Sequence, residues 1–170
     1  FSQVCLSTNI INNKHYAVKM ETDNTINLLK HEATILQYLN SSKCPNIPLI
    51  YYYGIQSKYT ILIMSYFDNG NLKNNSIIMT DNHKIEWWNQ MISTLQHIHN
   101  HGIVHRDLKP EHFMKKNNKW FLLDFGLSNT FLDSNNNHIE NCIKNDIVGT
   151  PKYASINVHN GYECVCRDDF

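Results

Sequence analysis

The fold is decided by His105-Arg106-Asp107-Leu108-Lys109-Pro110-Glu111-His112-Phe113-Met114, which is followed after a short segment by Leu123-Asp124-Phe125-Gly126. An isolated Arg-Asp pair is usually just solvated, and an isolated Asp-Phe-Gly is usually a turn. Here both motifs occur in this order, with a strand-like segment between them. We therefore predict two neighbouring loops that bring Asp107, Lys109 and Asp124 to one site.

Apolar periodicity predicts an α+β chain, with one helix among the early strands and a long helix before the two loops. The first helix is expected over residues 25–39 with Asn24 as its cap, and the second from Asp81, as its cap, to about Asn100. One stripe of the long helix carries Trp88, Ile92, Leu95 and His99. The predicted strands are 3–8, 15–20, 47–53, 59–64, 113–116 and 120–123, with turns at 9–14, 54–58 and 117–118. Segment 128–149 has little periodicity and exceeds an ordinary loop, which indicates a functional loop.

Composition and charge narrow the possible functions. The 170 residues carry a formal net charge of zero, so no global basic field favours binding to nucleic acid or to a membrane. No apolar run approaches the ~20 residues needed to span a bilayer. The five cysteines are odd in number and contain no Cys-x-x-Cys pair, which favours a reduced, intracellular compartment.

Four histidines, His97, His99, His101 and His105, resemble a metal cluster in sequence only. Helical residues two apart point to different faces, so only His97 and His101 would share one. We therefore predict no metal site there, and we expect His99 to pack and His105 to brace the loop around Asp107.

Further stretches give the chain its resemblance to a known family. Tyr16-Ala17-Val18-Lys19 stands on a predicted strand, and Gly149-Thr150-Pro151-Lys152-Tyr153-Ala154-Ser155-Ile156-Asn157 follows the long loop, with His159-Asn160-Gly161 and Arg167-Asp168-Asp169 beyond it. The chain resembles the protein kinases of the casein kinase 1 group, which includes the vaccinia-related kinases. Most kinases carry Ala-Pro-Glu where this chain has Ser155-Ile156-Asn157, and the Ser-Ile-Asn version is distinctive of that group.

This resemblance implies a two-lobed, protein-kinase-like α+β fold, with a small antiparallel β lobe that carries one helix and a mainly helical large lobe. Residues 1–66 would form the small lobe and the start of the hinge, and residues 67–170 the N-terminal part of the large lobe. Phe1 aligns with the tip of a glycine-rich loop, and the match stops just after Asp169. We therefore expect a partial kinase domain that is truncated at both ends.

The resemblance also implies transfer of the γ-phosphate of ATP to Ser and Thr hydroxyls of proteins, with Mg²⁺ as cofactor. Asp107 would orient the hydroxyl and accept its proton, Lys109 would offset charge on the γ-phosphate, and Thr150 would support both and select Ser and Thr. Asp169 resembles a buried carboxylate that caps the catalytic loop. Lys152 stands where this group places a basic residue that favours acidic or already phosphorylated substrates, although an ordinary surface lysine is an equal alternative.

ATP is expected between the two lobes. By the resemblance, Lys19 would contact the α- and β-phosphates and pair with Glu32 on the following helix. Glu21 is the competing partner, but it lies too close along the chain to serve. The gatekeeper, the hinge and the walls of the adenine slot would be formed by Val4, Ala17, Met64, Ser65, Tyr66, Phe67, Met114 and Leu123.

The expected metal site departs from the family pattern. Asp124 would hold Mg²⁺, but His112 stands where the family has Asn. Neutral imidazole can bind metals but suits Mg²⁺ poorly, because Mg²⁺ prefers oxygen ligands. A pseudokinase that binds nucleotide or a partner without turnover is therefore the competing hypothesis. A small-molecule phosphotransferase of related fold is a third possibility, which Lys109 and the 149–157 loop disfavour.

Overall fold

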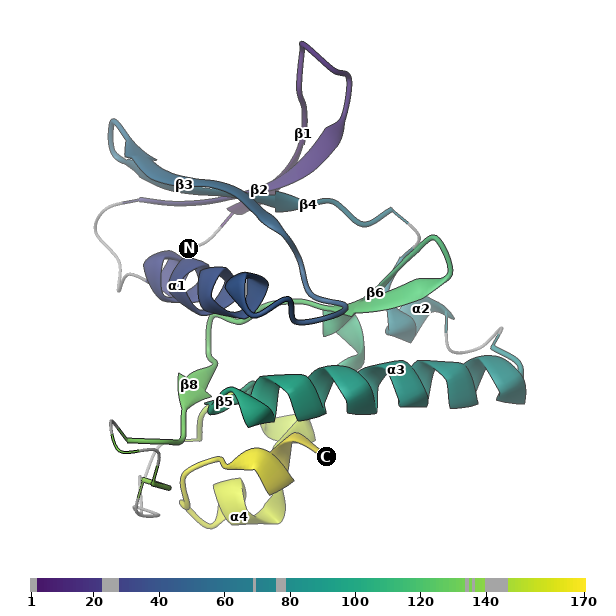
Figure 1. Cartoon of the computed structure of the whole chain (residues 1–170), viewed down its shortest axis with the longest axis vertical. Helices are drawn as coiled ribbons and strands as arrows, with labels where there is room; N and C mark the ends of the chain where they lie inside the picture. Colours follow the sequence, from purple (N-terminus) through teal and green to yellow (C-terminus); the bar gives the residue numbers. More distant parts are fainter. Residues whose placement is uncertain are drawn as a thin grey trace.

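The computed structural model describes residues 3–22, 28–68, 70–75, 79–133, 135, 137–139 and 147–170. A four-stranded antiparallel sheet lies above a mainly helical part, as Figure 1 shows. The strand order is β1-β2-β4-β3, and α1 lies between the sheet and the helical part. The elements of this first part are β1 Gln3–Thr8, β2 His15–Thr22, α1 Leu28–Ser41, β3 Ile50–Gln56 and β4 Tyr59–Ser65.

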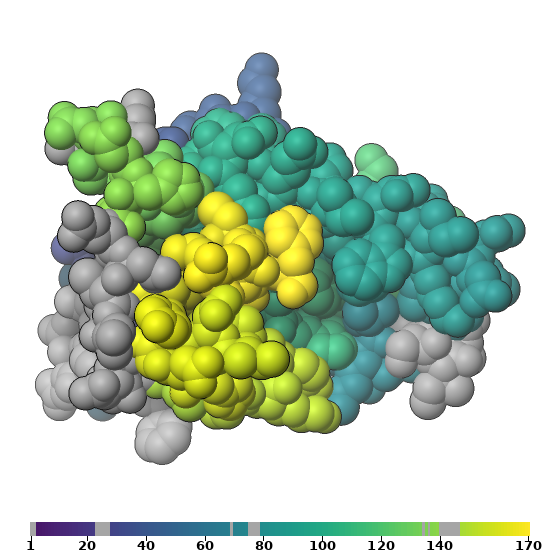
Figure 2. All heavy atoms as spheres, turned by 90° about the horizontal axis from the view of Figure 1, so that it is seen from below, coloured from purple at the N-terminus to yellow at the C-terminus, as the bar shows by residue number. Residues whose placement is uncertain are grey.

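The second part is organised around the long helix α3, which crosses the lower half of Figure 1. The β6–β7 hairpin and the small β5–β8 sheet carry the two motif-bearing loops. Seen from below in Figure 2, the C-terminal residues lie directly beside α3. The elements are α2 Leu72–Asn75, α3 Asp81–Asn100, β5 Ile103–Val104, β6 Phe113–Lys116, β7 Lys119–Leu122, β8 Asn129–Thr130 and α4 Ile156–His159, with 3-10 helices η2 Pro110–His112, η3 Pro151–Tyr153 and η4 Cys166–Asp169.

One buried apolar cluster joins α1, α3 and the β6–β7 hairpin. Phe125, from the Asp-Phe-Gly motif, is completely buried in this cluster, so its side chain anchors the loop that carries Asp124. Burial of an aromatic side chain of this size stabilises a fold by about 2–3 kcal/mol. The other buried members are Ile35, Leu36, Leu39, Ile47, Met91, Leu95, Ile98, Ile103, Phe113, Trp120 and Leu122.

The predicted α+β kinase-like fold is confirmed, and the largest change among the predicted strands concerns β3. Strand β3 begins at Ile50 rather than at the predicted Ile47, which is buried in the core ahead of the strand. It also runs through Gly54, the start of the predicted turn, and Gly54 pairs with Ile61 of β4. The turn is instead formed by Ser57 and its neighbour, and Ser57 has a φ of 55°.

The long helix is confirmed, but its cap was wrong. The cap is Thr80, whose hydroxyl accepts a hydrogen bond from the backbone amide of His83 at 3.4 Å. Asp81 is the first helical residue and pairs with Lys84 at 2.8 Å. The start of the predicted 25–39 helix and its cap Asn24 lie outside the described residues, and α1 is confirmed from Leu28 onward.

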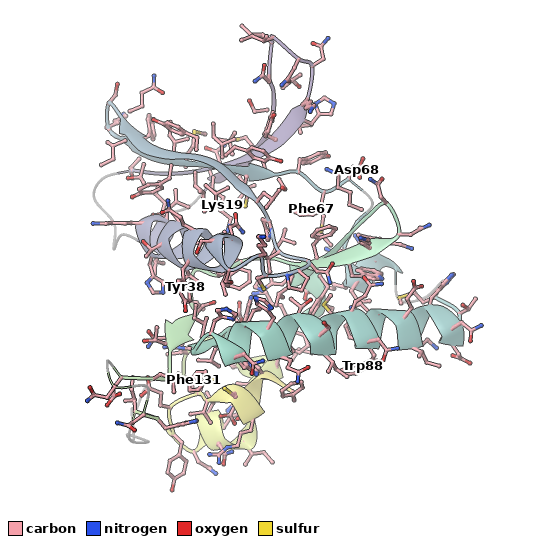
Figure 3. All side chains as sticks on the ribbon, viewed as in Figure 1. Lys19, Tyr38, Phe67, Asp68, Trp88 and Phe131 are labelled. Carbon is pink, nitrogen blue, oxygen red and sulfur yellow. The ribbon has the colours of Figure 1, made fainter. Side chains whose placement is uncertain are left out.

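The predicted stripe of α3 only partly faces the protein. Leu95 is buried, and the His99 side chain is only 11% exposed. Trp88 and Ile92 are 51% and 45% exposed, and Trp88 lies on the side of α3 that faces away from the sheet (Figure 3). The apolar side of the helix is therefore wider than its buried part, which carries Met91, Leu95 and Ile98.

A search of the described helices finds none that is both long enough and apolar enough to cross a bilayer.

Candidate functional site

The first half of the site is an ion pair between the sheet and α1. Lys19 on β2 donates to both carboxylate oxygens of Glu32, with Nζ–Oε distances of 2.7 and 2.9 Å. Its Nζ also lies 3.4 Å from Oδ1 of Asp124. Burial opposes the charged form of Lys19, but the carboxylates of Glu32 and Asp124 outweigh it and raise the pKa of Lys19. Lys19 is therefore a fixed positive charge, and Figure 3 shows it between the sheet and α1.

Glu21, the competing candidate for pairing with Lys19, instead contacts the backbone of α1. Its side chain is buried and accepts a hydrogen bond from the backbone amide of Leu29 at 3.1 Å. This amide belongs to the first turn of α1, where a carboxylate is favoured by the helix dipole. Glu21 therefore holds the start of α1, while Glu32, one turn further along the helix, meets Lys19.

The second half of the site surrounds Asp107. Its Oδ1 accepts hydrogen bonds from the amide and the hydroxyl of Thr150 at 2.7 and 2.6 Å, and its Oδ2 accepts one from Lys109 Nζ at 2.8 Å. Lys109 also donates to the Thr150 hydroxyl at 3.0 Å. Burial raises the pKa of Asp107, but the hydrogen bonds from Lys109 and Thr150 outweigh it and hold the pKa below its ordinary value. Asp107 is thus an ionised acceptor at neutral pH.

The backbone around Asp107 is held by Asp169. The amides of His105 and Arg106 donate to its two oxygens at 2.8 and 3.0 Å, and His99 Nε2 lies 2.8 Å from Oδ2. Arg106 has a φ of 71°, a left-handed conformation that these hydrogen bonds stabilise. The predictions that Asp169 caps this loop and that His99 packs against the protein agree with this geometry.

His105 braces the loop, as predicted. It is fully buried, its Nε2–H donates to the carbonyl of Leu123 at 3.1 Å, and its Nδ1 accepts from the amide of Asp107 at 3.3 Å. Burial lowers the pKa of His105, which matches the neutral ring that this pattern requires. The ring therefore ties the loop of Asp107 to the strand end that precedes Asp124.

The residues predicted around adenine lie on one face of the sheet. Val4 pairs with Lys19 across β1 and β2, and Ala17 pairs with Met64 across β2 and β4. Residues opposite each other, and residues two apart, point to the same side, so these four side chains share the face toward α1. Met64 is buried, whereas Val4 is 59% exposed on the outer strand.

The residues predicted for the hinge also lie close to the β6–β7 hairpin, which carries other residues predicted around adenine. Ser65 ends β4, and Phe67, labelled in Figure 3, packs its ring 4.7 Å from that of Phe121 on β7. Phe121 pairs with Met114 across the β6–β7 hairpin. Leu123 follows this hairpin, and its amide donates to the carbonyl of His112 at 2.9 Å.

Asp124 and His112, the predicted metal residues, face each other. His112 Nε2 lies 3.2 Å from Oδ2 of Asp124, while Oδ1 faces Lys19. Burial raises the pKa of Asp124, but His112 and Lys19 together outweigh it and hold the pKa well below its usual range. Among the described residues, no group of three or more His, Cys, Asp or Glu side chains could hold a metal ion. An ion here would therefore need further ligands from nucleotide and water.

The donor set fits Mg²⁺ only in part. The Asp124 carboxylate is the kind of oxygen ligand that Mg²⁺ accepts, and its side chain is 45% exposed. The second protein ligand would be the imidazole nitrogen of His112, which suits Mg²⁺ poorly. His97 on α3 and His101 just after the helix stack on each other, with ring centres 4.4 Å apart.

Two contacts at the site carried no sequence signal. His31 on α1 lies with Nε2 2.6 Å from the carbonyl of Ser128, just after the Asp-Phe-Gly motif. Lys116 donates to the carbonyl of Tyr66 at 2.8 Å and so ties the hinge to β6. A lone histidine or lysine on a polar face matches ordinary surface residues equally well, so only the tertiary structure reveals these links.

Gly149 allows the 149–157 loop to reach Asp107. Its φ is 97°, and a Cβ at this position would collide with the carbonyl oxygen of Arg106. Gly149→Ala is expected to displace Thr150 from Asp107 and to lower kcat/KM of the reaction carried out at this site by about 10- to 100-fold, since small misplacements of reacting groups cost this much. Steady-state kinetics would measure the effect.

Gly161→Ala is the matched control, because Gly161 also has a positive φ, of 85°, and follows α4, where its amide donates to the carbonyl of Val158 at 3.1 Å. The control should lose stability without a comparable loss of kcat/KM. Equal kinetic effects of the two substitutions would show that the approach of Gly149 to Arg106 has no special role.

Asp168 makes the stability of the 149–157 loop dependent on pH. Its side chain is 1% exposed and accepts hydrogen bonds from the Ser155 hydroxyl at 2.7 Å and from the amide of Val165 at 2.9 Å. Burial raises the pKa of Asp168, but these bonds outweigh it and lower the pKa below the ordinary 3.8. The stabilisation is therefore present above about pH 4 and is lost as the pH falls through the folded-state pKa.

Asp168→Asn is expected to reduce the free energy of unfolding by about 1–2 kcal/mol at pH 7, because it weakens charged hydrogen bonds. The difference between parent and variant should shrink as the pH falls below 4. Denaturant unfolding over a series of pH values measures it, and a difference that does not change with pH would contradict this role of the ionised carboxylate.

The two halves of the site, Lys19–Glu32 with Asp124 and Asp107–Lys109 with Thr150, are thus assembled from elements distant in sequence. A comparison with protein families gives the same result from the sequence side. The family model described as protein kinase domain matches residues 1–162. The chain belongs to the protein kinase domain family.

Proposed function

We propose that the chain is a serine/threonine protein kinase of the casein kinase 1 group, which transfers the γ-phosphate of ATP to Ser and Thr hydroxyls of proteins. The observation that supports this most is the contact of Lys19 with both Glu32 and Asp124, next to the separate Asp107–Lys109–Thr150 network. On this proposal, residues 1–66 are the small lobe and the start of the hinge, and residues 67–170 belong to the large lobe.

The proposed chemistry needs a proton acceptor and positive charge around the phosphates. The substrate hydroxyl oxygen bonds to the γ-phosphorus while the bond from that phosphorus to the β–γ bridging oxygen breaks, and ADP leaves. Asp107, ionised and fixed by Thr150, takes the hydroxyl proton. Lys109 offsets charge on the transferred group, and Lys19 holds the α- and β-phosphates. Ala17, Met64, Ser65, Phe67, Met114, Leu123 and Val4 enclose or border the adenine.

Specificity for Ser and Thr is proposed to come from Thr150, because it sits between Asp107 and Lys109 and limits the room beside the reacting hydroxyl. Lys152 is exposed next to Thr150 on η3. A positive charge at this place would favour acidic or already phosphorylated protein substrates.

Membership in the casein kinase 1 group is supported by the way the Ser-Ile-Asn stretch is used. Ser155 caps α4 by accepting from the amide of Val158, and its hydroxyl donates to Asp168 at 2.7 Å. Asn157 donates to the same Asp168 oxygen at 3.3 Å. Both distinctive side chains thus have a structural partner in the Arg167-Asp168-Asp169 stretch, which also belongs to the resemblance.

A second candidate is a nucleotide-binding module without turnover. The observation that favours it is His112, which occupies the family's Asn position and contacts Asp124. The two candidates differ in whether bound ATP is consumed in the presence of substrate.

The test is an assay of the protein with γ-labelled ATP and acidic peptides that contain Ser, Thr or Tyr. We expect labelled phosphoserine and phosphothreonine, with little phosphotyrosine, and weaker labelling of a neutral peptide of the same length. Binding of ATP without labelling of any peptide would favour the second candidate. Labelling of Tyr alone would contradict the proposed specificity.

A further inference from the structure

The inference concerns His112, whose ring has a fixed orientation. Its Nδ1 lies 2.9 Å from the backbone carbonyl oxygen of Asp107. A carbonyl oxygen can only accept a hydrogen bond, so Nδ1 carries a hydrogen and donates it. Nε2 is consequently the ring nitrogen that faces Asp124, and a divalent cation bound between them replaces the hydrogen that Nε2 directs at the carboxylate when no ion is present. The side chain is only 9% exposed, so the ring has little room to turn over.

The backbone also fixes His112 relative to Asp124. The amide of His112 donates to the carbonyl of Lys109 at 2.9 Å, which closes the 3-10 turn η2. The carbonyl of His112 accepts from the amide of Leu123, also at 2.9 Å. Leu123 immediately precedes Asp124, so the same hydrogen bond that aligns the two segments places Nε2 opposite the Asp124 carboxylate.

The two atoms are spaced as neighbouring ligands of one ion. Nε2 of His112 lies 3.2 Å from Oδ2 of Asp124. In an octahedral shell with ligands about 2.1 Å from the ion, adjacent ligands lie about 3 Å apart. Oδ1 of Asp124 faces Lys19 at 3.4 Å, so the carboxylate presents Oδ2 to the side where His112 stands.

The ligand chemistry then decides which ion fits. Mg²⁺ takes oxygen ligands almost exclusively and rarely binds imidazole. Divalent first-row transition ions accept imidazole nitrogen, and Mn²⁺ among them also accepts the oxygen-rich, octahedral surroundings that phosphates and water provide. A site with one carboxylate and one imidazole, completed by a nucleotide, therefore matches Mn²⁺ better than Mg²⁺.

We propose that His112, together with Asp124, makes Mn²⁺ rather than Mg²⁺ the preferred cation for nucleotide binding in this protein. The proposal rests on the proposed function, since it needs a nucleotide in the cleft. On this proposal, the replacement of the family's Asn by His112 changes which cation the site binds and does not abolish the site.

The first test uses the parent protein, a non-hydrolysable ATP analogue and Mn²⁺ alone or Mg²⁺ alone. Calorimetric titration should give a Kd for the analogue at least about tenfold lower with Mn²⁺, the scale by which a change at a metal site alters affinity. Pulsed electron paramagnetic resonance of the bound Mn²⁺ should show coupling to an imidazole nitrogen, a direct signature of His112 as a ligand.

The second test compares His112→Asn with a matched control, His83→Asn, which makes the same chemical change at an exposed position on α3. His112→Asn should lose the nitrogen coupling and bring the two Kd values together, whereas His83→Asn should retain the parent's preference. If His112→Asn fails to fold, the resonance signal of the parent still decides.

The outcomes separate the two proposals. Tight binding of the analogue without nitrogen coupling, or with equal Kd values for the two ions, overturns the role of His112 and leaves the proposed kinase function standing. No binding of the analogue with either ion contradicts nucleotide binding itself, and the choice of ion falls with it.

Discussion

Replacing Asp124 with Asn is expected to lower kcat/KM for phosphoryl transfer by about 10²–10³-fold, the range for loss of one preorganised electrostatic group. The substitution keeps the size of the side chain but removes its charge. Asp124 is the carboxylate that meets both Lys19 and His112, at 3.4 and 3.2 Å. Without it, the positive side chains around the phosphates lose the group that positions them, and any divalent cation loses its charged oxygen ligand. Steady-state kinetics with labelled ATP would measure the loss.

A matched control is Asp81→Asn, the same chemical change at a 91% exposed side chain at the start of α3. The control should keep the parent's kcat/KM, while circular dichroism should show that both variants are folded. Substantial activity in Asp124→Asn would mean that transfer does not depend on this carboxylate, and the proposed arrangement of the site would be wrong.

Much of the site followed from sequence because its residues stand at fixed short spacings within two loops. Asp107 and Lys109 are two residues apart, and the structure joins them through a 2.8 Å hydrogen bond. The Lys19–Glu32 contact could also be anticipated, because a helix directly follows the strand that carries Lys19. Local order along the chain determines such contacts, so the sequence pattern predicts them.

The missed features depend on packing that no local pattern encodes. Gly54 is compatible with a turn, but pairing with β4 extends β3 through Gly54 to Gln56. Thr80 and Asp81 are both good helix caps, and neighbouring structure selects Thr80. Apolar periodicity predicts a stripe that includes Trp88, but it does not show which part of that stripe the core covers.

His112 shows that sequence-based prediction has the same limit at the functional site. The sequence revealed that it replaces an expected Asn, which raised the question of activity. The direction of its ring depends on the carbonyl of Asp107 and on the alignment of Leu123 with η2, both of which come from tertiary structure. The chemical interpretation of this position therefore changes once the orientation of Nε2 is known.

Replacing Asp107 with Asn is expected to lower kcat by about 10²–10⁴-fold, the range for removal of a positioned general base. The Kd for ATP should stay within about twofold of the parent's, because Asp107 acts on the substrate hydroxyl and not on the nucleotide. The amide oxygen of Asn can still accept from the two donors of Thr150. Its amide nitrogen then replaces the oxygen that accepts from Lys109, so Lys109 keeps only the Thr150 hydroxyl as a partner. Single-turnover kinetics would measure the chemical step, and calorimetric titration would measure nucleotide binding.

The comparison between Asp107→Asn and Asp124→Asn is the sharper test. Both remove one negative charge from the cleft, yet the first should separate catalysis from nucleotide binding and the second should impair both. This difference follows from the positions of the two carboxylates. Asp107 is hydrogen-bonded to Thr150 and Lys109, whereas Asp124 contacts Lys19. If Asp107→Asn weakened nucleotide binding as much as Asp124→Asn, the two carboxylates would share one electrostatic role, and assignment of the proton acceptor to Asp107 would have to be abandoned.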